Sequence, residues 1–233
     1  MHPHLLNRLI IHYLFPQRLY PLNNNNPYLY KIYINIIMPK YNIYIICKTE
    51  EDFLEKSKDI NDKYSSKICH IQWIPAEYLK LTQCNKKLLK DLHTRWNTSG
   101  KKTLAKLGNI AAHRKALLAI YMNKTDNNII LEADAEFSAK LPSPPDKSCY
   151  MGGWLIPPQV SKAGEKIDIS PKRGLNTIDY DKFSVIMTHA LFIKTFEESI
   201  ELFQTTITDK IKNYDIHLKE LEYFKYFYYP PIF

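Results

Sequence analysis

The chain has 233 residues, of which 45% are hydrophobic and 13% aromatic, so it is large enough to bury a core and is neither disordered nor collagen-like. It carries 32 Lys and Arg residues against 24 Asp and Glu residues, and this excess favours anionic partners such as nucleic acid, an acidic membrane or a phosphorylated small molecule. It shows no apolar run long enough to span a membrane, and Leu5–His12 is too interrupted for a signal peptide, so we expect a cytoplasmic protein without stable membrane insertion.

The first 37 residues show none of the patterns of core structure. They contain four consecutive asparagines, Asn23–Asn26, several isolated prolines and no sustained apolar period. We therefore predict that residues 1–37 form a poorly ordered extension and that residues 38–233 form one domain. Met38 is a candidate for the true start of the protein.

The domain begins with a pattern of strand, helix and strand. Tyr41–Cys47 is a short aromatic and β-branched run typical of a buried strand, and Ile68–Ile74 is strand-like again. Between them, Thr49 is suited to cap a helix over about residues 50–64. This order predicts the parallel beginning of an α/β sheet.

Two further helices are expected in the middle of the chain. The first covers roughly residues 76–91 and leads into a polar loop that is closed by Lys101 and Lys102. The second, about Asn109–Met122, carries an inward stripe of residues at spacings of three and four. The stripe consists of Ile110, His113, Leu117 and Ile120.

The short predicted strand Asn128–Leu131 runs directly into an acidic segment. If this segment stays extended, Glu132, Asp134 and Glu136 project from one face, because alternate side chains of a strand share a side. Neighbouring carboxylates repel each other and are normally held by a cation or by basic partners, and oxygen ligands suit Mg²⁺ or Mn²⁺. The alternative is a decorated surface strand, but the end of an apolar strand is where α/β sheets hold ligands.

The stretch Lys86–Lys106 holds seven basic residues and one acidic residue. It leads to Gly108–Ile110, which we interpret as a helix N-terminus whose free N–H groups face a phosphate, aided by Lys101 and Lys106. The alternatives are a solvated basic face for the lysines and, for His113, a hydrogen-bonded histidine near the start of a helix.

The last third of the chain adds two predicted strands, Tyr150–Ile156 and Ser184–Ile193, then a helix over residues 196–206 and an aromatic tail that we expect to pack. Two polar residues interrupt these apolar stretches. His189 is most simply a core histidine, whereas Asp215 is a base, a late metal ligand or the N-cap of a turn.

Three segments together resemble glycosyltransferase family 25, the lipopolysaccharide-type sugar transferases and collagen galactosyltransferases, which also occur in large DNA viruses. Thr103–His113 is similar to the family's T-x-G-E-x-G-C-x-x-S-H block and keeps its threonine, second glycine and histidine. Ile130–Phe137 is similar to the I-L-E-D-D-x-x-F segment. Met151–Trp154 followed by Thr188–Ile193 is similar to the last-strand region.

The resemblance implies an α/β fold of the GT-A type, with a mixed central sheet flanked by helices, and a UDP-sugar donor with a glycan or protein acceptor. It implies that Asp134 coordinates Mn²⁺ or Mg²⁺ and that Glu132 assists at the metal or the donor ribose. Glu136 and Asp215 are the candidate catalytic residues. The expected donor-binding residues are Lys101, Lys106, Gly108, His113 and His189. A viral member of the family would act in a viral factory or a virion.

The sequence departs from the family at several motif positions. Ala133 replaces the middle aspartate of the acidic segment, and Lys106 and Asn109 replace an acid and a cysteine. One alternative is therefore a catalytically degenerate scaffold that keeps the fold. Another is a nucleic-acid-binding module in which Lys86–Lys106 contacts phosphates and Trp96 stacks a base. We favour a nucleotide sugar over nucleic acid as the partner.

Overall fold

The computed structural model describes residues 41–64, 69–76, 86–97, 100–136, 138, 141–156, 171–186, 189–208 and 213–233. The predicted N-terminal extension, residues 1–37, lies outside these ranges. Its predicted lack of order therefore stays a prediction.

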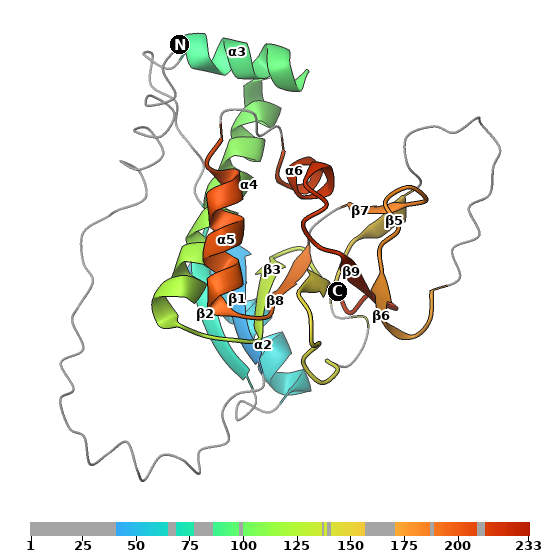
Figure 1. Cartoon of the computed structure of the whole chain (residues 1–233). Coiled ribbons are helices and arrows are strands. Elements are labelled where there is room, and N and C mark those ends of the chain that lie inside the picture. Colours follow the sequence, from blue (N-terminus) through green and yellow to red (C-terminus); the bar gives the residue numbers. More distant parts are fainter. Residues whose placement is uncertain are drawn as a thin grey trace.

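A mixed sheet of seven strands, in the order β2-β1-β3-β8-β4-β9-β6, forms the centre of the molecule (Figure 1). β1 (Tyr41–Cys47) pairs in parallel with β2 (Cys69–Pro75) and β3 (Asn128–Glu132), and β8 (Ala190–Ile193) runs antiparallel to β3. The other strands of this sheet are β4 (Cys149–Tyr150), β9 (Tyr226–Tyr229) and β6 (Gly174–Thr177), while β5 (Trp154–Ile156) and β7 (Ser184–Ile186) form a separate sheet of two strands. The predicted α/β class with a mixed sheet is confirmed.

Helices cover both faces of the sheet, which explains why every residue of β1 is buried. One face packs against α2 (Glu50–Lys63) through Ile60, and the other packs against α4 (Gly100–Asn123) through Leu117 and Ile120. The remaining helices are α3 (Lys86–Trp96), α5 (Phe196–Thr206) and α6 (Tyr214–Glu220). None of the helices in the described part of the chain combines the length and the apolar character needed to cross a membrane.

Helices α2 and α5 begin where the sequence predicts. The hydroxyl of Thr49 accepts a hydrogen bond from the backbone N–H of Asp52, whose carboxylate in turn accepts from the backbone N–H of Thr49. This capping box satisfies two donors that the helix itself leaves open. Thr195 caps α5 in the same way by accepting from the backbone N–H of Glu198.

Helix α4 is longer than predicted. It begins at Gly100, well before Asn109, so Lys101 lies in its first turn rather than in a loop. Gly108 suggests a break in the sequence, but one glycine inside a helix costs only about 1 kcal/mol. Thr103, five residues earlier, is fully buried, so the part of the helix before Gly108 also packs against the rest of the molecule. The predicted helix N-terminus at Gly108 is therefore wrong.

Other predicted boundaries also change. The helix expected over residues 76–91 is observed as α3, which ends at Trp96, and residues 77–85 lie outside the described ranges. The predicted strand Tyr150–Ile156 is divided into β4 and β5, and the predicted strand Ser184–Ile193 into β7 and β8. In both cases the chain passes between the large sheet and the small one. The aromatic tail packs as predicted, because β9 joins the large sheet.

Two buried basic side chains hold the C-terminal end of α5. Arg114 of α4 donates from Nε to the hydroxyl of Thr206 at 2.9 Å, and its guanidinium also contacts the Thr206 carbonyl. His217 of α6 lies with Nε2 2.9 Å from the carbonyl oxygen of Thr205. Because the last carbonyls of a helix have no partner within the helix, these contacts tie α4, α5 and α6 together.

Burial lowers the pKa of His217 from its ordinary value of 6.5. The unfolded chain therefore protonates at a higher pH than the folded chain, so the stability linked to the neutral ring is present above about pH 6.5 and is lost as the pH falls. We expect the free energy of unfolding in urea to decrease more steeply on acidification for the wild type than for His217→Gln, which keeps a donor for the carbonyl but does not titrate. Parallel pH curves for the two proteins would contradict this.

Candidate functional site

The candidate site forms where β3 ends and β8 begins. In the antiparallel pairing of these strands Leu131 lies opposite Ala190, and the backbone N–H of Glu132 donates to the carbonyl of His189 at 2.9 Å. Two residues far apart in the sequence thus meet at one edge of the sheet. It is the edge at which the parallel strands β1 and β3 end, and α/β sheets bind ligands at this edge.

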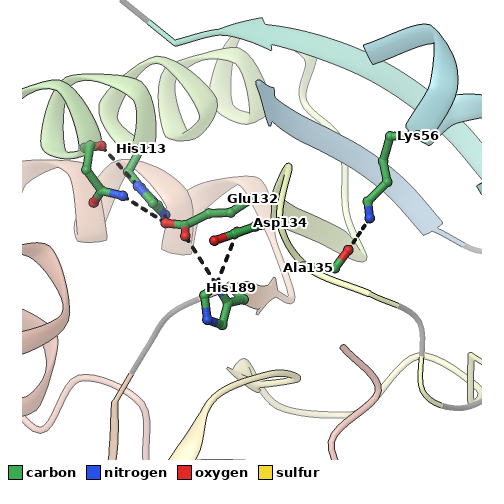
Figure 2. Close-up of polar contacts among 7 residues, drawn as sticks. Lys56, His113, Glu132, Asp134, Ala135 and His189 are labelled. Atoms are coloured by element: carbon green, nitrogen blue, oxygen red, sulfur yellow. Dashed lines mark hydrogen bonds and ion pairs between the residues drawn. The ribbon is translucent and has the colours of Figure 1, made fainter. Parts of the chain in front are cut away.

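Glu132, Asp134 and His189 converge there, as Figure 2 shows. The Nδ1 atom of His189 lies 3.4 Å from Oε2 of Glu132 and 3.3 Å from Oδ1 of Asp134. One ligand atom from each of the three side chains lies within 4.8 Å of the others. The side chain of Glu132 is 19% exposed and that of Asp134 is 71% exposed, so this metal cluster extends from the edge of the core to solvent.

The acidic segment is not extended as predicted. The backbone N–H of Ala135 donates to the carbonyl of Glu132 at 3.1 Å, so the chain turns immediately after β3. The ammonium group of Lys56 in α2 binds the carbonyl of Ala135 and holds the turn from the other side (Figure 2). The predicted face of three carboxylates is therefore wrong. Glu136 lies outside the metal cluster. Its third position is taken by His189, which was expected as a core histidine or, from the family resemblance, as a donor-binding residue.

The donor set of the metal cluster suits a divalent cation. Carboxylates supply hard oxygen ligands, and the imidazole of His189 supplies a nitrogen. Nδ1 of His189 is buried and has no hydrogen-bond partner among the residues that the structure describes. A cation would satisfy this atom and would also offset the repulsion between the carboxylates of Glu132 and Asp134. Oxygen ligands alone suit Mg²⁺, whereas an added imidazole favours Mn²⁺ and other transition metals.

Helix α4 orients the Glu132 carboxylate from the side opposite His189. Asn109 donates from Nδ2 to Oε1 of Glu132 at 2.8 Å, and Nε2 of His113 lies 3.6 Å from the same oxygen. His113 is fully buried, and its Nδ1 lies 3.0 Å from the carbonyl oxygen of Asn109. Its ring packs against that of Tyr214, with 4.1 Å between the ring centroids. The predicted inward position of His113 is confirmed. The contact of Asn109 with Glu132 was not predicted, although Asn109 lies one turn before His113.

The lysines predicted to bind the donor lie along the same helix. Lys106 is half-exposed and precedes Asn109 by three residues, which puts both on one side of α4. Lys101 is exposed and lies about 12 Å from Asn109 along the helix axis, farther than Lys106. Gly108 lies within α4, so it offers no helix N-terminus to a phosphate. Lys106 is therefore the better candidate to meet an anion at the metal cluster.

Glu136 and Asp215, the predicted catalytic residues, lie in different parts of the fold, Glu136 in the loop after β3 and Asp215 in α6. Glu136 lines a cleft of about 530 Å³ together with Asp134 and His189. We term this cleft the metal cleft. Asp215 lies in the first turn of α6, where Asn213 is the N-cap. The N-cap interpretation of Asp215 is therefore wrong, and its role in catalysis stays a prediction.

No protein-family model matches the chain, and no curated protein matches it. The likeness to glycosyltransferase family 25 therefore remains a resemblance of short motifs. What the site itself offers is a group of two carboxylates and one imidazole at the ligand-binding edge of an α/β sheet.

The mixed donor set predicts that Mn²⁺ binds more tightly than Mg²⁺. At about 100 times its Kd, Mn²⁺ is expected to raise the free energy of unfolding by about 2.7 kcal/mol, measured by urea denaturation. Asp134→Asn and His189→Gln should each remove most of this gain. Asp181→Asn, an exposed carboxylate between β6 and β7, is the matched control and should keep it. A wild type that does not respond to Mn²⁺ would rule out the metal site.

The contacts from α4 predict a second effect on the metal. His113→Phe preserves the ring against Tyr214 but removes the nitrogen that faces Glu132, and loss of such an orienting group typically weakens metal binding by about 10–100-fold. Calorimetric titration with Mn²⁺ measures this change, and the melting temperature of the metal-free variant shows whether it folds. His93→Phe, a partly buried histidine in α3, should bind Mn²⁺ like the wild type. An unchanged Mn²⁺ affinity in folded His113→Phe would mean that His113 does not position Glu132.

Proposed function

We propose that the protein is a metal-dependent glycosyltransferase of the GT-A type that moves a sugar from a UDP-linked donor to a glycan or protein acceptor. The metal cluster of Glu132, Asp134 and His189 carries this proposal. It lies where an α/β sheet admits a ligand, and its two carboxylates, Glu132 and Asp134, fall within Ile130–Phe137, the segment that resembles the acidic motif of family 25. The motif resemblance supports sugar transfer over other reactions of a nucleotide.

The side chains around the metal cleft have different roles in the proposed reaction. Glu132, Asp134 and His189 would hold Mn²⁺ or Mg²⁺, which when bound neutralises negative charge on a departing diphosphate. Lys106 supplies further positive charge from α4. Glu136 is the candidate base: it takes the proton of the acceptor hydroxyl while that oxygen bonds to the anomeric carbon and the bond from this carbon to the diphosphate oxygen breaks.

The alanine at position 133 does not count against activity. Ala133 lines a different hollow, together with Glu136 and with Asp52 of α2, and it is not among the described residues that line the metal cleft. A carboxylate at this position would face α2. An alanine at this position therefore takes no ligand away from the metal cluster. This supports an active enzyme over a degenerate scaffold.

The basic stretch gives less support to nucleic-acid binding. Base stacking needs an open aromatic face, but Trp96 is only 7% exposed and belongs to the core. The expectation that Trp96 stacks a base is therefore wrong. The nucleic-acid alternative therefore rests on phosphate contacts alone. These could come from the exposed side chains of Lys90, Lys101 and Lys102.

A screen of nucleotide sugars with Mn²⁺ tests the proposed function. A UDP-sugar is expected to raise the melting temperature only with Mn²⁺ present, and to release UDP slowly by donor hydrolysis. Asp134→Asn should abolish both effects, and Asp181→Asn should keep both. Salt-sensitive binding of single-stranded nucleic acid without a response to any nucleotide sugar would overturn the proposal. Binding of the donor without UDP release or transfer would instead identify a scaffold.

A further inference from the structure

A second hollow, of about 340 Å³, adjoins the metal cleft. Gly153, Trp154 and Pro231 line both spaces, so Trp154 borders the two. Tyr228 and Tyr229 of β9 form another part of the wall. We term this space the aromatic hollow.

The aromatic hollow is uncharged. None of the described residues that line it carries a charge, although the chain has a formal net charge of +8 and the neighbouring metal cleft is lined by Asp134 and Glu136. An anionic ligand would lose hydration there without gaining a cationic partner, and such uncompensated burial is costly. The hollow therefore favours a neutral ligand.

The exposed aromatic rings indicate the kind of neutral ligand. Trp154 is 66% exposed and Tyr229 is 37% exposed. Trp and Tyr combine an apolar ring with a polar group at its edge. A pyranose has the complementary chemistry, because C–H groups form an apolar face and hydroxyl groups form a polar rim. A sugar ring could thus lie against Trp154 and exchange hydrogen bonds with nearby tyrosine hydroxyls.

We propose that the aromatic hollow is the acceptor subsite and holds one neutral pyranose ring against Trp154. This inference rests on the proposed function. The donor diphosphate must reach Asp134 and His189 in the metal cleft, which leaves the space on the other side of Trp154 for the acceptor. The volume lies at the lower end of ligand pockets, about 300–1,000 Å³, and so fits a sugar unit better than a folded protein segment. The acceptor is accordingly a neutral glycan.

Saturation-transfer NMR on the full chain with methyl glucoside, methyl galactoside and methyl mannoside tests this subsite. At least one of these neutral sugars is expected to bind, and glucuronic acid should bind at least about tenfold more weakly because its charge lacks a partner. Trp154→Ala should weaken sugar binding at least about tenfold, with partial recovery in Trp154→Phe. Tyr121→Ala, an exposed aromatic residue on α4, is the matched control and should bind like the wild type.

The outcomes separate the subsite from the proposed function. Loss of sugar binding in Trp154→Ala with unchanged Mn²⁺ affinity would support the subsite, because the variant then keeps its metal cluster. If none of the neutral sugars binds while Mn²⁺ and a UDP-sugar still do, the subsite is wrong and the proposed function stands. Equal binding of glucuronic acid would overturn the neutral preference. Binding of neutral sugars without any response to UDP-sugars would overturn the acceptor role together with the proposed function.

Discussion

The register between β3 and β8 is the constraint on which the metal cluster depends. Leu131 lies opposite Ala190, and the next residues, Glu132 and His189, meet through a backbone hydrogen bond of 2.9 Å. Because side chains alternate along a strand, a shift of one residue would turn Glu132 to the other face of the sheet. The same shift would move Ile129 and Leu131, which are fully buried, out of the cluster in which they pack. Core packing therefore maintains the geometry of the site.

Glu132 and Asp134 contribute to the metal cluster in different ways. One oxygen of Glu132 receives a hydrogen bond from Asn109 at 2.8 Å, and the other lies 3.4 Å from His189. A carboxylate this near the core requires such partners, because an unpaired buried charge is costly. Asp134 is 71% exposed and stays open to solvent. One ligand fixed by the fold and one accessible ligand suit a cation that also binds an exchangeable molecule.

The correct predictions from sequence rest on local signals, and the errors involve contacts between distant segments. The apolar run of β1 and the capping residue Thr49 each determine their own element. Glu132 could be predicted because it directly follows an apolar strand. The start of α4 could not be predicted, because packing overrides the low helix propensity of Gly108. The position of His189 beside Glu132 could not be predicted either, because it depends on the pairing of β3 with β8.

Two glycines determine the position of Trp154, which lines the metal cleft. Gly153 has a φ of 117°, a conformation that other residues rarely adopt. At Gly152 an added Cβ would lie 2.9 Å from the backbone oxygen of Phe233, so a larger residue would displace one of the two segments. These glycines end β4 in the large sheet and let the chain enter the small sheet at Trp154. A continuous strand, as the apolar pattern predicts, would carry Trp154 along the large sheet instead. The break in the strand and the position of Trp154 at the metal cleft therefore have the same cause.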